Sequence, residues 1–179
     1  MCKVSLYIAA SLDGYIAKLD GSIKWLEEFP NPEGSDFGYA DFLEEVDTIL
    51  MGGKTYRQVL TFGEWPYRNK ECYVFSRSAT MERDANVIFV KDDIAGFVRE
   101  LKSRNGKVIW LVGGGEVNNI LLCQGLVDEI ILTCVPVLLG AGISISGTVE
   151  MEEYFEPIKT KTFKNGMIQL TFGRQKQNG

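Results

Sequence analysis

Glycines stand where a buried strand gives way to a helix in the stretch Lys107–Gln124, KVIWLVGGGEVNNILLCQ. Val108–Val112 is an unbroken apolar run, which predicts a strand buried on both faces. Gly113–Gly115 follow, and a helical pattern begins at Glu116. Such an arrangement can bind phosphate, because glycine lets an anion approach the backbone and the first N–H groups of a helix point at it. The alternative is a tight strand-to-helix turn without a ligand, and glycines alone do not decide between the two.

A second strand–glycine–helix pattern lies in Thr48–Thr55, where Gly52 and Gly53 follow a short apolar strand. It ends like a P-loop, but a P-loop needs a glycine at the position of Thr48. The dinucleotide fingerprint G-x-G-x-x-G fails in the first stretch, because Asn118 stands where its last glycine belongs. A nucleotide site here would therefore follow neither of these two motifs.

Ser76 and Arg77 follow a third expected strand, Glu71–Phe75. The carboxyl ends of parallel strands meet at one edge of a sheet, so the three loops are expected to converge there. This convergence favours a nucleotide-like ligand over a bare scaffold. The alternative to ligand binding is that Arg77 is a solvated turn residue and that Lys54 is an exposed residue in the first turn of its helix.

Composition and charge narrow the classes of function. The chain has 179 residues, 45% of them hydrophobic and 24% charged, with a net charge of −5, no histidine and four scattered cysteines. A negative net charge argues against a general nucleic-acid or anionic-membrane surface, and no apolar run approaches a membrane span. The absence of histidine and of metal-ligand spacing argues against a zinc site or a histidine-based triad, so no metal is expected. The cysteines are interpreted as reduced thiols of a cytoplasmic protein.

Strands and helices alternate along most of the chain, which predicts an α/β fold in a single domain, residues 1–179. We expect a mainly parallel eight-stranded mixed sheet with about four flanking helices, with Val108–Val112 inside the sheet and an antiparallel hairpin at the C-terminal end. Loops are expected at Ser11–Ala17 and Pro136–Gly142. The expected strands are Lys3–Ala10, Thr48–Met51, Glu71–Phe75, Asn86–Val90, Val108–Val112, Ile130–Val135, Thr160–Phe163 and Met167–Phe172. The expected helices begin at Ser35 or Asp36, at Lys54, at Ile94 after an Asp92 or Asp93 cap, and at Glu116.

Several segments, in this order, resemble the dihydrofolate reductase superfamily: IAASLDGYIA, ILMGGKTY, YVFSRS, WLVGGGEV and LVDEIILTCVPVLLG. The segments SLDGYIA, LVDE and PVLLGAG are more narrowly similar to the reductase domain of riboflavin biosynthesis, the RibD C-terminal domain, and its stand-alone bacterial relatives. The resemblance covers nearly the whole chain. It implies a dihydrofolate reductase-like fold and an NADPH-dependent hydride transfer to a small heterocyclic or ribosylaminopyrimidine-like substrate.

The resemblance also implies where the cofactor NADPH lies. Ala10 and Ile16 would flank the nicotinamide, and Ser76 and Arg77 would meet the adenosine and its 2′-phosphate. The remaining cofactor-binding residues that it implies lie in the two glycine loops and their helices: Gly53, Lys54, Thr55, Val112, Gly114, Gly115, Glu116 and Val117. Backbone N–H groups and a threonine hydroxyl suit a pyrophosphate, and arginine suits a dianionic phosphate.

The catalytic acid is the point at which the chain departs from true dihydrofolate reductases. These enzymes place a carboxylate on the first helix, and counting back from Met51-Gly52 puts Asp36 there. The alternative is that Asp36 caps the helix, with Asp41 as a further candidate acid. If Asp36 is a cap, the proton for the reduction would come from water. Trp25 is a candidate for substrate contact, with a core or loop anchor as its alternative.

Two other functions remain open at this stage, a dihydrofolate reductase proper and a non-catalytic nucleotide-binding protein that retains the fold. NADPH binding separates a reductase from the non-catalytic alternative, and NADPH consumption with dihydrofolate separates the two reductases. We further expect a small-molecule substrate and no nucleic-acid or membrane partner. A homodimer is expected as well, because the resemblance to the often dimeric riboflavin branch implies one and because apolar strands, such as Ile130–Val135 and Met167–Phe172, lie near both ends of the chain. NADPH should bind more tightly than NADH, mainly through Arg77.

Overall fold

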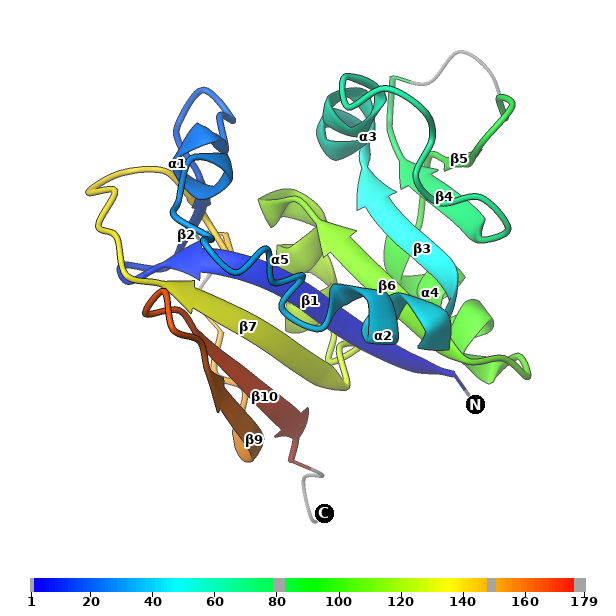
Figure 1. Ribbon diagram of the computed structural model, residues 1–179. Coiled ribbons are helices and arrows are strands. Elements are labelled where there is room, and N and C mark those ends of the chain that lie inside the picture. The colour runs from blue at the N-terminus through cyan, green and yellow to red at the C-terminus, as the bar shows by residue number, and fades with distance from the viewer. Residues whose placement is uncertain (1, 79–82, 148–150, 176–179) are drawn as a thin grey trace.

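The computed structural model describes residues 2–78, 83–147 and 151–175, which form a twisted sheet with helices on both faces (Figure 1). The strands are β1 (Lys3–Ser11), β2 (Tyr15–Ala17), β3 (Val46–Gly52), β4 (Glu71–Phe75), β5 (Ile88–Val90), β6 (Val108–Gly113), β7 (Glu129–Val135), β8 (Ile143–Ser144), β9 (Phe155–Thr162) and β10 (Ile168–Arg174). The helices are α1 (Lys24–Glu27), α2 (Tyr39–Glu45), α3 (Gly53–Leu60), α4 (Ile94–Ser103) and α5 (Gly115–Cys123). Within the described residues, no helix has the length and apolar character needed to cross a membrane.

The main sheet has eight strands in the order β5-β4-β3-β6-β1-β7-β10-β9. All neighbours from β5 to β7 are parallel, whereas β10 runs antiparallel to both β7 and β9. Strand β6 pairs with β3 on one side and with β1 on the other. The structure thus confirms the mainly parallel eight-stranded mixed sheet, its antiparallel C-terminal hairpin and the interior position of Val108–Val112.

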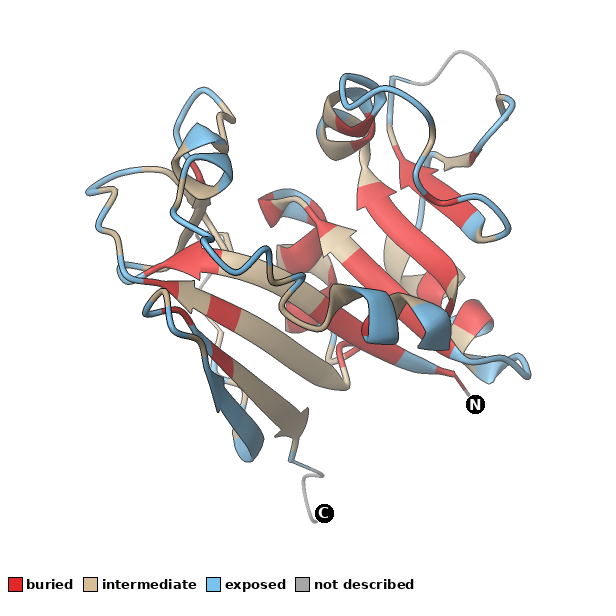
Figure 2. Ribbon diagram, in the orientation of Figure 1, coloured by how far each residue is buried: buried red, intermediate tan, exposed pale blue. Residues whose placement is uncertain are grey.

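The core consists of two apolar clusters, one on each face of the sheet. Ile49 and Met51 of β3 pack with α2 and α3, while Leu50 between them packs with α4 and α5. Successive side chains of a strand point to opposite faces, so this alternation means that helices cover both faces. Each fully buried apolar side chain of this kind stabilises the fold by about 1.5–3 kcal/mol. Figure 2 shows that the buried residues concentrate in the central strands β3, β6 and β1, and that β9 is largely exposed.

Helix α4 shows how local sequence sets a boundary. Asp93 is its N-cap and accepts a hydrogen bond from the backbone N–H of Gly96 at 3.0 Å, as the sequence predicts. Val98 and Leu101 lie buried on its inner face. The helix ends at Ser103, just before Asn105-Gly106, which is typical of a helix stop.

Helix α2 begins later than the sequence predicts, at Tyr39 rather than after Ser35 or Asp36. The reason is the backbone: Phe37 and Gly38 have φ values of +57° and +85°, which a right-handed helix does not contain. The structure also contains α1, a four-residue helix that has no buried residue and therefore leaves no apolar pattern in the sequence.

A short two-stranded ribbon was not predicted: β2 lies within the expected loop Ser11–Ala17, and β8 directly follows the expected loop Pro136–Gly142. Strand β2 pairs antiparallel with β8 next to the main sheet. These strands have only three and two residues, too few for a period of two to appear in the sequence. The hairpin strands β9 and β10 are also longer than predicted, because β9 is an edge strand with an exposed face and carries Pro157 and lysines in place of an apolar alternation.

Candidate functional site

The two glycine loops lie against each other at the carboxyl ends of the neighbouring parallel strands β3 and β6. A Cβ atom on Gly52 would stand 3.3 Å from Cγ2 of Val117, and one on Gly114 would stand 3.4 Å from Oγ1 of Thr55. Both contacts cross from one loop to the other. The loops can approach this closely because neither carries a side chain at these positions.

The third loop joins them through Ser76, directly after β4. Its Oγ lies 3.2 Å from the position that a Cβ of Gly53 would occupy. The structure therefore brings the three loops together at one sheet edge, as the sequence predicts. It also brings in Arg57 of α3, whose Nη1 lies 3.6 Å from the same position. Arg57 was not predicted from the sequence, although its place one helical turn after Gly53 is a signal that could have indicated it.

The N-terminal ends of α3 and α5 open into this region. Their N-caps are Gly52 and Gly114, and neither end has a side-chain cap. In α4, by contrast, the carboxylate of Asp93 takes up the backbone N–H of Gly96. The first N–H groups of a helix attract anions unless a side chain occupies them. The first N–H groups of α3 and α5 can therefore donate to a ligand, whereas in α4 the carboxylate of Asp93 already accepts one of them.

Three charged side chains surround the meeting point, one from each loop. Lys54 Nζ lies 3.9 Å from one carboxylate oxygen of Glu116, and Arg77 Nη2 lies 3.7 Å from the other. Their side chains are 84%, 75% and 88% exposed for Lys54, Glu116 and Arg77, respectively. Exposed pairs of this length contribute about 0–1 kcal/mol, so a ligand can rearrange them at little cost.

The remaining expected cofactor residues line the same edge at different depths. Ala10 is 2% exposed near the end of β1, while Ile16 in β2 and Val112 in β6 are half-buried. The β2–β8 ribbon lies on the start of α5, since a Cβ on Gly115 would stand 3.0 Å from both Ile143 Cγ2 and the Ser144 carbonyl oxygen. This contact joins the strand that carries Ile16 to the second glycine loop.

Two asparagines of α5 hold the segment after β8 in place. Nδ2 of Asn118 donates to the Ile145 carbonyl oxygen at 3.0 Å, and Nδ2 of Asn119 donates to that of Ser146 at 2.7 Å. Asn118 is fully buried, and no donor among the described residues reaches its Oδ1. Neither role was predicted from the sequence. A polar residue next to Val117 on the inner side of an apolar helix was the available signal.

Asp13 joins the segment before β2 to the segment before β8. Its carboxylate accepts the Ser11 hydroxyl at 2.6 Å and the backbone N–H groups of Leu139 and Gly140, the latter at 2.7 Å. These donors hold the pKa of Asp13 below its usual value of 3.8. Asp13 falls in the expected loop Ser11–Ala17, and its contacts with distant residues leave no signal in the local sequence.

The lowered pKa predicts how Asp13 affects stability with pH. Its contribution is complete above about pH 4 and is lost as the pH falls through the lowered pKa of the folded state, because the protonated acid no longer accepts these bonds as strongly. The difference in melting temperature between the wild type and Asp13→Asn should therefore be constant from about pH 8 to pH 5 and shrink below about pH 4. Thermal unfolding at each pH measures it. A difference that grows towards acid pH would contradict the assignment.

Asp36 is exposed, and its carboxylate is engaged by backbone groups. It accepts the N–H of Ala40 at 2.9 Å and that of Gly38 at 3.0 Å. These two hydrogen bonds lower its pKa, so the group is ionised at neutral pH, whereas an efficient general acid has a pKa near the working pH. Asp36 thus resembles a helix cap more closely than an acid, although α2 itself starts at Tyr39.

Trp25 lies in α1 and is half-buried. Its indole N–H is enclosed and has no acceptor among the described residues. A buried indole usually finds a partner, so this N–H is available to an acceptor that comes with a ligand. The loop anchor and the substrate contact both stay predictions for Trp25.

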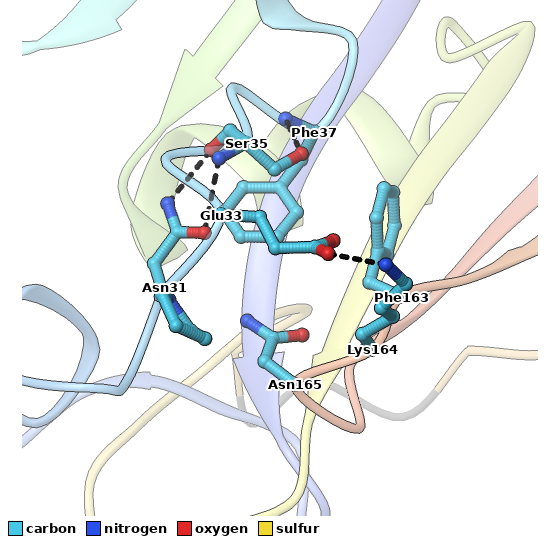
Figure 3. Close-up of a pocket in the computed structure, with 8 residues that line it drawn as sticks. Asn31, Glu33, Ser35, Phe37, Phe163, Lys164 and Asn165 are labelled. Atoms are coloured by element: carbon cyan, nitrogen blue, oxygen red, sulfur yellow. Dashed lines mark hydrogen bonds and ion pairs between the residues drawn. The ribbon is translucent and has the colours of Figure 1, made fainter.

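A small cavity lies away from the glycine loops, between the segment before α2 and the turn that joins β9 to β10 (Figure 3). Its volume is about 20 Å³, which is room for one water molecule. Glu33 pairs with Lys164 at 2.5 Å across it, and the rings of Phe37 and Phe163 meet edge to face. These contacts dock the segment before α2 onto the hairpin, and the cavity is too small for a substrate.

Solved structures with the same topology define the class of the fold. The dihydrofolate reductase of Enterococcus faecalis, solved with NADP(H), aligns over 97% of both chains with a TM-score of 0.67 at 14% identity. The deaminase–reductase of Thermotoga maritima aligns over 97% of this chain and 57% of its own, with a TM-score of 0.72 at 18% identity. At these identities the likeness shows the fold alone, which is dihydrofolate reductase-like.

The family follows from closer comparisons. A model of the RibD C-terminal domain matches residues 2–169, so the chain belongs to the RibD C-terminal domain family. YwjB of Bacillus subtilis (strain 168) is 42% identical over 173 residues, which cover 96% of this chain and 98% of that protein. A Shewanella sp. PV-4 protein whose name refers to riboflavin biosynthesis is 32% identical, with a TM-score of 0.86, over 98% of this chain and all of its own.

Proposed function

We propose that the protein is an NADPH-dependent reductase that acts on a small heterocyclic or ribosylaminopyrimidine-like substrate. The observation that carries the proposal is the convergence of three strand-end loops, two of them glycine-rich helix starts, on one sheet edge. The family supports a reductase-type function, and the named relatives with this fold include reductases.

The chemistry of the edge fits a dinucleotide. In this proposal the backbone N–H groups of Gly53–Thr55 and Gly114–Val117, together with the Thr55 hydroxyl and Lys54, hold the pyrophosphate. Ser76 and Arg77 take the 2′-phosphate, with Arg57 close enough to assist. The carboxylate of Glu116 opposes an anion here. The proposed nicotinamide position lies towards Ala10, Ile16 and Val112.

The cofactor supplies the hydride when it is bound. The chain's own residues orient the two partners and exclude water, and the ribbon carrying Ile16 is held against α5 for that purpose by Asn118 and Asn119. We propose that water supplies the proton, because Asp36 is ionised and its carboxylate is occupied by backbone donors. The same observation disfavours a dihydrofolate reductase proper. The indole of Trp25 is the proposed contact to the substrate.

The test has two steps. First, NADPH binding is measured by the quenching of tryptophan fluorescence and by calorimetry. Second, NADPH oxidation is followed with ribosylaminopyrimidines, other small heterocycles and dihydrofolate. The proposal expects binding, and oxidation with at least one heterocycle but not with dihydrofolate. Binding without any turnover would favour the non-catalytic alternative, and turnover of dihydrofolate would favour the second reductase.

We also propose a cytoplasmic homodimer. All four cysteines are free thiols, which suits a reducing compartment. Strand β9 is the last strand of the sheet, and Ile158 and Ile168 of the hairpin are 62% and 40% exposed. An exposed edge with apolar side chains is commonly covered by a second copy. Light scattering should return twice the chain mass of 20.0 kDa, and a monomer mass at high concentration would contradict this prediction.

A further inference from the structure

The charges at the candidate site do not all favour an anion. Lys54 and Arg77 come from different loops, yet both point at the carboxylate of Glu116, at 3.9 and 3.7 Å. Glu116 lies in the first turn of α5, where the partial positive charge of the helix stabilises a carboxylate. The side chain therefore takes the place beside both cations that the proposed cofactor's phosphates would take.

We propose that the Glu116 carboxylate competes with anionic ligands for Lys54 and Arg77. It neutralises both cations in the free protein and must be displaced when a ligand with several negative charges binds. The inference rests on the proposed function for the identity of that ligand, a phosphorylated dinucleotide. The backbone N–H of Glu116 still faces the pyrophosphate in this account, and only its side chain acts against the ligand.

Exposure makes the displacement easy. All three side chains are at least three-quarters exposed, so the pairs are screened by solvent and the carboxylate can turn away into water. The carboxylate nevertheless weakens each anion that needs these cations, and most of all a ligand that uses both of them. A dinucleotide can still bind, because it adds contacts to helix N–H groups that the Glu116 side chain does not occupy.

The Glu116 charge also affects the preference for NADPH over NADH. Arg77 is the proposed partner of the 2′-phosphate, and NADPH differs from NADH by that group alone. Removal of the Glu116 charge frees Arg77 for this phosphate and frees Lys54 for the pyrophosphate that both cofactors share. Glu116→Gln should thus tighten both cofactors, and NADPH more than NADH.

The experiment measures dissociation constants of NADPH, NADH and inorganic pyrophosphate for the wild type and Glu116→Gln. We expect Glu116→Gln to bind NADPH about five- to tenfold more tightly and pyrophosphate about threefold more tightly, with a smaller gain at high salt. Glu100→Gln is the matched control, because it removes the same charge from an exposed pair with Arg104 in the C-terminal half of α4. It should leave all three constants unchanged.

The double variant Arg77→Ala/Glu116→Gln tests the route of the effect. If Glu116 acts through Arg77, the gain for NADPH should fall to that for NADH when Arg77 is absent. Equal pyrophosphate constants for the wild type and Glu116→Gln, weaker binding by the variant, or no pyrophosphate binding by either would overturn the inference. Tighter pyrophosphate binding by the variant without any binding of NADPH or NADH would leave Glu116 as an anion competitor and remove the proposed function instead.

Discussion

Arg77→Ala should weaken NADPH binding about ten- to a hundredfold and change NADH binding little. Arg77 follows β4 beside Ser76, and its side chain is 88% exposed. The two cofactors differ by one phosphate, and a charge-assisted contact to it contributes about 1.5–3 kcal/mol. Solvent screening places the expected loss towards the lower end of the resulting range. Calorimetric dissociation constants of both cofactors measure the change in their ratio.

Three variants serve as controls for this prediction. Arg77→Lys keeps the charge but not the planar fork, so it should recover part of the preference. Lys54→Ala should weaken both cofactors about equally, because its place at the start of α3 suits the shared pyrophosphate. Arg57→Ala tests the neighbouring guanidinium. If Arg57→Ala changes the cofactor ratio and Arg77→Ala does not, the 2′-phosphate lies against α3 and the assignment to Arg77 is wrong.

Gly114→Ala should reduce binding of NADPH and NADH at least about tenfold, with little loss of stability. Gly114 has φ of −78° and ψ of −170°, a conformation open to any residue. Among the described residues, a methyl group there has one neighbour within 4 Å, Oγ1 of Thr55 at 3.4 Å. The fold can therefore accept alanine. The methyl group would stand between the two glycine loops, where it keeps a pyrophosphate from the helix N–H groups, each worth about tenfold or more in affinity.

Gly113→Ala is the matched control. It adds the same methyl group one residue earlier, where it should lower the stability of the fold. Gly113 has φ of +113°, a value that side chains other than hydrogen rarely permit, and its Cβ would stand 3.3 Å from Oδ1 of the buried Asn118. We expect a clear drop in melting temperature for Gly113→Ala and a shift of only a few degrees for Gly114→Ala. Full NADPH affinity in Gly114→Ala would show that no anion approaches this loop.

Much of the fold could be predicted because its central strands carry unbroken apolar runs. In the structure Val108–Leu111 are buried and Val112 is half-buried. Apolar runs of this kind are typical of parallel strands whose two faces are covered by helices. The edge strand β9 and the ribbon strands β2 and β8 could not be bounded in the same way. Their positions depend on pairing with distant segments, which local periodicity does not encode.

In the candidate site, too, the features with a local sequence signal were predicted and the contacts between distant residues were not. Glycines after strands predicted where the backbone loops meet, because strand direction alone sends their ends to one edge. The side chains that hold the site were missed. Asp13 bonds to residues 126 and 127 positions away, and Asn118 bonds to one 27 positions away, so only the folded chain reveals them. The pairing of Glu116 with Lys54 and Arg77 was likewise not predicted, because these two residues come from other loops.

The central claim is that the three loops hold NADPH, and an NMR titration tests it most directly. Backbone amide signals of the protein are assigned and followed as NADPH is added. The account predicts saturable shifts concentrated at Gly53–Thr55, Ser76–Arg77 and Gly114–Val117, with the signals of the distant cavity around Asn31 and Asn165 unchanged. Absence of any shift, or shifts that centre on that cavity while the three loops stay still, would contradict it.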